Sequence, residues 1–199
     1  NAAGHASLFK DRFSVTAEKG TVTAAQGGAI DITGTSFVVP FVRMPKAPAE
    51  VYLQTDSTIT AALTLLDRPP MKFLTKANQP VTIADGRAKV TGKVDLLLMK
   101  NLPADKIAFD IVGNLSSVRS EKIVPGRVLT AAQLKVSATS SDFVISGPGR
   151  IGQVPFEGAF RTKLGKNSGT ATVRGWVELS ERFINEFRIG LPSGSVAGA

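Results

Sequence analysis

The sequence predicts a mainly β protein. We expect an elongated, twisted antiparallel sheet, groove-like or sandwich-like, built from repeated strand units with a small helical insertion at about 57–78. The first observation behind this is the pattern G-x-A-x-V-x-G-x-V-D/E-L, which occurs at 86–96 and 169–179 and in shortened form at 28–34. The second is that apolar and polar residues alternate in each copy, the period of a strand with one face in water. Repeated strands usually act through a long surface rather than a compact catalytic cluster.

The N-terminal part, residues 7–55, is expected to form short strands. Apolar side chains alternate along it and are interrupted by glycine and proline, which commonly end strands. The expected turns are at Gly20, at Gly27-Gly28 and in the loop 45–48.

The helical insertion breaks this alternation. Its apolar residues fall at i, i+3, i+4 and i+7, which places them on one helical face: Ile59, Ala62, Leu63 and Leu66. Asp56 or Ser57 is expected to cap the first N–H groups of a first helix, which Pro69-Pro70 ends. Pro70 is also acceptable as the first residue of a second short helix, with Asn78 as a left-handed terminator.

From residue 81 onward the β pattern returns, which gives about ten strands in all. Their apolar positions fall at 88–98, 107–111, 134–138, 143–145, 156–160, 173–179 and 187–191, with a turn at 147–152. Strands that are buried on both faces contain continuous apolar runs, whereas these have one apolar and one polar face. The apolar face must be covered by a second sheet, by the helices or by a bound apolar ligand.

Length and composition place few limits on the class of protein. A chain of 199 residues with 43% hydrophobic residues contains one domain or two small ones. We expect residues 1–6 to be a tag remnant or linker, and 7–199 to be one domain cut from a longer chain. The sequence shows no run of 18 apolar residues, and no signal peptide is visible in it. The net charge of +8 suits an anionic partner, but the dispersed basic residues fit a solvated surface better.

Residues that could perform catalysis are scarce. His5 is the only histidine and there is no cysteine, which excludes Ser-His-Asp, Cys-His and multi-histidine sites. No two carboxylates have a spacing that indicates shared acid–base work. The segment 147–152 matches G-x-G-x-x-G formally, but Pro148 lacks an N–H and a strand follows, so a tight hairpin turn is the better interpretation. We therefore expect no enzymatic activity, no metal and no cofactor.

Nucleic-acid binding is also disfavoured. No recognition helix is visible, and Trp176 is the single tryptophan, on the polar face between Arg174 and Glu178. A lone tryptophan across a sheet face is more often covered by neighbouring chain than stacked on a base. Nucleic acid is therefore not expected as a partner.

The segment 63–71, with the sequence LTLLDRPPM, resembles the LLDxPPL helix-and-proline segment of the AsmA-like proteins of Gram-negative bacteria, in particular the YhdP-type branch. The patterns that follow it, at 86–92, 145–156 and 187–198, also resemble that branch and occur in the same order. The resemblance covers roughly residues 7 to 199. Each pattern is degenerate, and their order around the helix-and-proline segment carries most of the similarity.

The resemblance implies an internal segment of a periplasmic protein that is attached to the inner membrane by a segment absent from this chain. Such proteins are thought to carry phospholipid along an apolar sheet face toward the outer membrane, in outer-membrane lipid homeostasis and biogenesis. The implied partners are phospholipid acyl chains and other envelope proteins. An acyl chain gains ~0.8 kcal/mol per buried CH₂, so carriage needs no catalytic residue.

Two rival functions stay open. One is a structural or assembly scaffold for envelope proteins without bound lipid, acting through its sheet edges and basic face. The other is a glycan-binding domain, for which only Trp176 and Tyr52 are available as exposed aromatic residues.

The lipid hypothesis selects apolar strand positions as groove-lining candidates, and for each of them ordinary core packing is at least as good an interpretation. The candidates are Val90, Val94, Leu96, Ile107, Phe109, Ile111, Val173, Val177, Leu179, Phe187 and Ile189.

Overall fold

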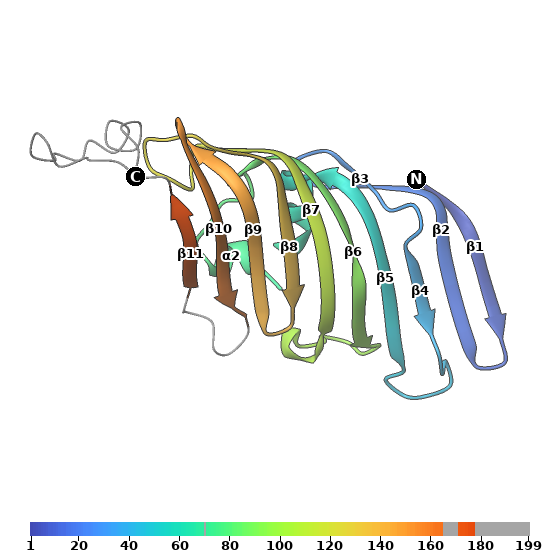
Figure 1. The fold of residues 1–199 in the computed structure, drawn as a ribbon. Coiled ribbons are helices and arrows are strands. Elements are labelled where there is room, and N and C mark those ends of the chain that lie inside the picture. The colour runs from blue at the N-terminus through green and yellow to red at the C-terminus, as the bar shows by residue number, and fades with distance from the viewer. Residues whose placement is uncertain (70, 165–170, 178–199) are drawn as a thin grey trace, which may run out of the picture.

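The computed structural model describes residues 1–69, 71–164 and 171–177. Within them the protein is one antiparallel sheet of eleven strands with two short α-helices on one side (Figure 1). The prediction of a mainly β fold with a small helical insertion is therefore confirmed. The elements are β1 (Ala2–Phe9), β2 (Arg12–Thr23), β3 (Ala29–Asp31), β4 (Ser36–Val39), β5 (Pro48–Thr58), α1 (Ile59–Leu66), α2 (Phe73–Lys76), β6 (Asp85–Leu97), a 3₁₀ turn (Ala104–Lys106), β7 (Ala108–Ser120), β8 (Leu129–Thr139), β9 (Asp142–Ile151), β10 (Val154–Lys163) and β11 (Ala171–Val177).

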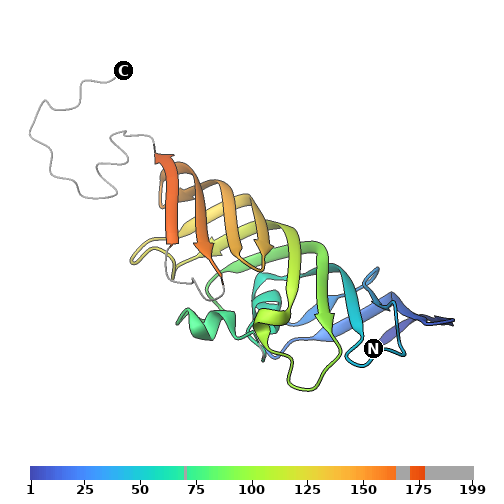
Figure 2. The same cartoon turned by 90° about the horizontal axis from the view of Figure 1, so that it is seen from below.

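The sheet is close to a simple meander. From β5 onward each strand pairs with the next strand along the chain, and β3 and β4 share the place between β2 and β5. The strand direction rotates steadily across the sheet, as the right-handed twist of β-strands requires (Figure 2). Residues 2–6, expected to be part of a tag remnant or linker, lie in β1, which pairs with β2 along its length.

The helical insertion begins where β5 ends. Thr58 is the N-cap of α1, one residue after the expected caps, and its hydroxyl accepts a hydrogen bond from the N–H of Ala61 at 3.1 Å. The helix ends at Leu66, as Pro69 predicts. The second helix begins at Phe73, and Pro70, its expected first residue, lies outside the described residues. Asn78 has the expected left-handed conformation, with φ of 53°. No helix in the described ranges is long and apolar enough to cross a membrane.

The main core lies between α1 and one face of the central strands. Ile59 of the helix joins a cluster of buried apolar residues on β6, β7 and β8 that includes Ala88, Val118 and Leu134. Two smaller clusters lie nearer the N-terminal strands, one around Ile30 and Ala61, the other around Val39 and Ala49. The helices are therefore a partial second layer on a sheet that extends beyond them on both sides.

Two predicted turns are wrong, both because glycine has another use inside strands. Gly20 lies within β2, where a side chain would press on Ile32, which follows β3 in the same polypeptide. Gly147 and Gly149 lie within β9, and the hairpin turn that follows β9 is at Gly152-Gln153. A glycine in a strand often marks a close approach by a neighbour rather than a change of direction.

Candidate functional site

The alternation of side chains gives the sheet an apolar face, on the side where the helices lie. Residues that are directly opposite in an antiparallel ladder project to the same side. Val51, Val94 and Phe109 are opposite one another across β5, β6 and β7. The face continues across β8 and β9 to Phe160 and Val173, which are paired across β10 and β11.

The helices cover the central part of this apolar face. Leu63 of α1 packs against the cluster on β6–β8 that contains Ala88 and Leu134. The ring of Phe73 in α2 meets the ring of Phe109 edge-on, with centroids 6.4 Å apart and an interplanar angle of 73°. The apolar face is thus protein core at β6–β8.

The apolar face is less covered at its C-terminal side. Val173 and Val177 of β11 are 77% and 38% exposed. Phe143 and Phe160 make an edge-on ring contact with centroids 6.4 Å apart and form the adjoining surface. Ile145 of β9 still packs against the cluster beneath α1, but Val173 and Val177 of β11 are exposed and can contact an external apolar ligand.

A row of glycines crosses this less covered region. Gly147, Gly158 and Gly175 are directly opposite one another on β9, β10 and β11. One flanking row contains Phe160 and Val173, and the other contains Phe156 and Val177, so apolar side chains border a row without side chains of its own, which Leu134 approaches at Gly147. This glycine strip was not predictable from the sequence, because the register between paired strands is what aligns the three glycines.

The structure divides the groove-lining candidates into groups. Val94, Phe109 and Ile111 adjoin one another on the apolar face and are half-buried. Val90 packs against the main core cluster and Leu96 against the cluster around Val39. The others are more distant or cannot be placed: Ile107 immediately follows the 3₁₀ turn, Val173 and Val177 lie far away on β11, and Leu179, Phe187 and Ile189 lie outside the described residues.

The opposite, polar face has a concavity of about 710 Å³. Residues of β5 to β9 line it, among them Gln54, Asp56, Asn114 and Lys135. Asp56 forms ion pairs with Arg87 and with Lys89 of the neighbouring strand. No group of three or more potential metal ligands occurs in the part of the chain that the structure describes.

A charged network also lies on the polar face, where β5 adjoins β6. The ammonium of Lys93 is 2.9 Å from a carboxylate oxygen of Glu50 and 2.9 Å from one of Asp95. Hydrogen bonds to Asp95 and Glu50 raise the pKa of Lys93, while the bond from Lys93 lowers the pKa of Glu50. One ammonium is shared by two carboxylates, an ion-pair network that is typical of strand pairing rather than of acid–base catalysis.

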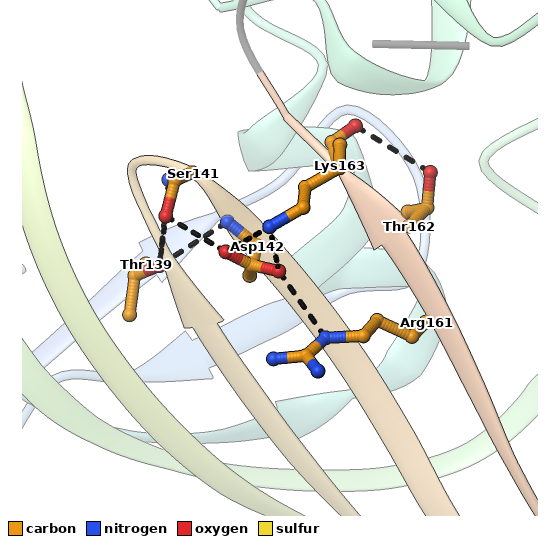
Figure 3. A network of polar contacts seen from close by, with 6 residues as sticks. All are labelled: Thr139, Ser141, Asp142, Arg161, Thr162 and Lys163. Carbon is orange, nitrogen blue, oxygen red and sulfur yellow. Dashed lines mark hydrogen bonds and ion pairs between the residues drawn. The ribbon is translucent and has the colours of Figure 1, made fainter. Parts of the chain in front are cut away.

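A second network fastens the C-terminal strands to one another (Figure 3). Asp142, the first residue of β9, accepts from Lys163 Nζ at 2.9 Å and from Arg161 Nε at 3.2 Å, both on β10. The hydroxyl of Ser141 donates to the same carboxylate at 2.8 Å. The hydrogen bond from Lys163, followed by that from Ser141, lowers the pKa of Asp142 below its ordinary value of 3.8.

The Asp142→Asn variant is expected to be less stable than the wild type at neutral pH. The pKa of Asp142 is lower in the folded state than in the unfolded chain. The stability that the ionised carboxylate contributes is therefore fully present above the unfolded pKa of about 4, and it is lost as the pH falls through the folded-state pKa. The difference in unfolding free energy between the wild type and Asp142→Asn should therefore become smaller in acid. Urea unfolding at a series of pH values measures this, with Asp110→Asn as the control, because Asp110 forms no ion pair among the described residues. A pH-independent gap would contradict the assignment.

No family model, curated protein or solved structure matches this chain.

Proposed function

We propose that this chain is a segment of an AsmA/YhdP-like protein of the Gram-negative cell envelope, which carries phospholipid along the apolar face of its sheet. The observation that supports this is the extension of the apolar face beyond its helical cover, to side chains as exposed as Val173. Large apolar surfaces without a cover commonly bind a ligand or partner. The motif order around the segment 63–71 supports the family assignment and a periplasmic location, attached to the inner membrane by a segment absent from this chain.

The chemistry required is modest. Acyl chains would lie against the apolar side chains and the glycine strip of β9–β11, while headgroups stay in water. At ~0.8 kcal/mol per buried CH₂, a few buried methylenes give useful affinity, and the lack of directional contacts permits sliding. Val94, Phe109 and Ile111, beside α2, would join this path only where the helix leaves them accessible. No catalytic group, metal or cofactor is required by this mechanism.

The proposal predicts that phospholipid co-purifies with the protein from a Gram-negative host without detergent. Val173→Asp places a charge on the apolar face and should greatly reduce the lipid detected by native mass spectrometry and extraction. Thr172→Asp is the matched control, because Thr172 is the adjacent residue of the same strand and faces the other side. Val173 is well exposed, so the sheet should keep its β circular-dichroism spectrum in both variants.

Two results would contradict lipid carriage. One is a folded wild-type protein with no lipid, and the other is equal lipid content in the Val173 and Thr172 variants. Val173→Asp is a cleaner test than Phe109→Asp, because Phe109 contacts Phe73 and its replacement would also release α2.

The alternative is a scaffold for envelope proteins, and the observation that favours it is that both outer strands of the sheet have one unpaired edge within the described residues. β1 and β11 each pair with a single strand of the described chain, and all their residues are exposed. Unpaired strand edges bind extended segments of a partner by adding a strand. Capture of a lipid-free complex with an envelope protein, abolished by a proline at Thr172 in β11, would favour the scaffold.

A further inference from the structure

Three connections meet at one end of the sheet, which Figure 1 shows at the bottom. They are the β1–β2 turn (residues 9–12), the β4–β5 loop (40–47) and the β6–β7 loop (98–107). The N–H of Val42 bonds to the carbonyl of Asp11 at 2.8 Å, which joins the first two. The N–H of Leu98 bonds to the carbonyl of Ala47 at 2.8 Å, which joins the last two. We call these three connections the loop end.

The loop end exposes large apolar side chains from every one of its connections. Phe9 is 68% exposed, Phe41 52%, Met44 53% and Leu98 43%. Leu8, Val42, Leu97 and Met99 beside them are also exposed. They come from separate connections that backbone hydrogen bonds hold side by side, so exposed apolar side chains gather at one end of the sheet, and we call them the patch. Such a patch indicates an interaction surface, because single scattered residues would need no explanation.

The same three connections are also rich in cations. The basic residues of the loop end are Lys10, Arg12, Arg43, Lys46, Lys100 and Lys106, all exposed, and its acidic residues are Asp11 and Asp105. Asp11 is paired with Arg43 at 3.0 Å and the charge of Arg12 also acts on Glu50 of β5, but six basic residues against two acidic ones leave the loop end positively charged. The ammonium of Lys10 lies 5.4 Å from the centroid of the Phe9 ring, next to the apolar surface rather than directed away from it.

We propose that the loop end docks on the surface of a bilayer containing anionic phospholipid. Phe9, Phe41, Met44 and Leu98 enter the boundary between headgroups and acyl chains, and the lysines and arginines of the same connections contact headgroup phosphates. Apolar and cationic side chains together match the two layers of that interface, and each Lys or Arg near an anionic surface adds attraction. This contact lies within the present chain and does not require that the apolar face carry lipid.

The charge pattern favours a bilayer over a second copy of the chain. Two loop ends packed together would place like charges against each other, which is unfavourable. An anionic lipid surface instead neutralises the positive charge. The contact would orient the sheet with its strands pointing toward the membrane, so that the apolar face starts at the bilayer surface.

Vesicle flotation tests the docking. The wild-type chain is expected to float with phosphatidylcholine vesicles that contain phosphatidylglycerol, and far less with phosphatidylcholine alone. The triple variant Phe41→Ser, Met44→Ser, Leu98→Ser should lower the partition coefficient by about tenfold or more. The double variant Lys46→Gln, Lys100→Gln should have a partition coefficient that is lower by about fivefold per cation removed. Added salt should also lower the partition coefficient of the wild type, because it screens the attraction to the anionic surface.

Matched controls separate the loop end from general stickiness and charge. Val112→Ser with Ile123→Ser removes apolar side chains that are 53% and 48% exposed but lie elsewhere. Lys19→Gln with Lys135→Gln removes two exposed cations outside the loop end. Both control proteins should bind vesicles within about twofold of the wild type. Equal losses in control and loop-end variants would overturn the proposal, as would wild-type binding that does not depend on phosphatidylglycerol.

The same variants also distinguish membrane docking from self-association through the patch and from lipid carriage on the apolar face. If the triple variant instead converts a dimer into a monomer in light scattering, and no vesicle binding occurs, the patch is a self-association surface. Val173→Asp should bind vesicles like the wild type, because β11 lies at the other side of the sheet from the β1–β2 turn. A chain that binds vesicles but carries no lipid would refute only the proposed function, and the reverse result would refute only the docking.

Discussion

Leu134→Ala is expected to lower the free energy of unfolding by about 3 kcal/mol, whereas Val173→Ala should change it by less than about 0.5 kcal/mol. Both residues are on the apolar face of the same sheet. Leu134 is 9% exposed and packs in the cluster beneath α1, while Val173 is 77% exposed. Removing a buried side chain costs its transfer free energy and leaves a cavity, and an exposed valine has little of either to lose.

Urea denaturation followed by circular dichroism measures both variants. Equal losses would show that the apolar face is a uniform core, with no part free for a ligand. The expected difference would divide it into a structural part under the helices and a less covered part on β9–β11, which is the arrangement that lipid carriage requires.

Gly27→Ala is expected to cost about 3 to 4 kcal/mol, and Gly28→Ala only about 1 kcal/mol. The two residues are adjacent and have similar left-handed conformations, with φ of 85° and 90°. A side chain on Gly28 would meet nothing within 4 Å. One on Gly27 would collide with the backbone of Ala61 at the start of α1, where neither side can yield without moving the helix.

The carbonyl of Gly27 explains why this contact is close. It accepts a hydrogen bond from the hydroxyl of Thr58 at 2.7 Å, and the same hydroxyl caps α1. A side chain at Gly27 would therefore disturb the helix cap as well as the turn. Thermal and urea unfolding of the two variants compare them directly. Equal destabilisation would mean that backbone conformation alone sets the requirement for glycine and that the turn does not anchor α1.

The closed and open parts of the apolar face have different consequences for function. The core under α1 gives the sheet a stable base, since an isolated single-layer sheet would leave one apolar side in water. This cover decreases toward β11, where Val173 and Val177 are exposed, whereas the apolar side chains of β9 and β10 on this face are half-buried or buried. This division allows the proposed lipid path and the folded core to coexist on one continuous face.

Several features were predictable because they depend on residues close together in sequence. Apolar alternation predicted the strands and their two-sided character, and the i, i+3, i+4, i+7 pattern of Ile59 and its neighbours predicted α1. Pro69 and Asn78 predicted where the two helices end, because proline and a left-handed residue limit the helix locally. The scarcity of catalytic residue types was also visible from composition alone.

Other features depended on pairing between distant residues, and here local patterns misled. Glycine is typical of turns, yet Gly20 and Gly147 lie within strands, where a neighbouring segment of the same protein approaches them closely. Val90 and Leu96 have the same pattern as Val94, but contacts with α1 and with β4–β5 made them part of the core. Neither the glycine strip nor the cationic, apolar loop end could be predicted from the sequence, because each combines residues from several separate segments.

The sequence by itself determined that the chain forms strands with one apolar face, interrupted by two short helices, because backbone preference and side-chain alternation act over a few residues. Only the tertiary structure decided which stretch of the apolar face the helices cover and which loops meet at one end. Those outcomes depend on strand register and on the side to which the helices fold, and both are fixed by packing between residues far apart in the chain.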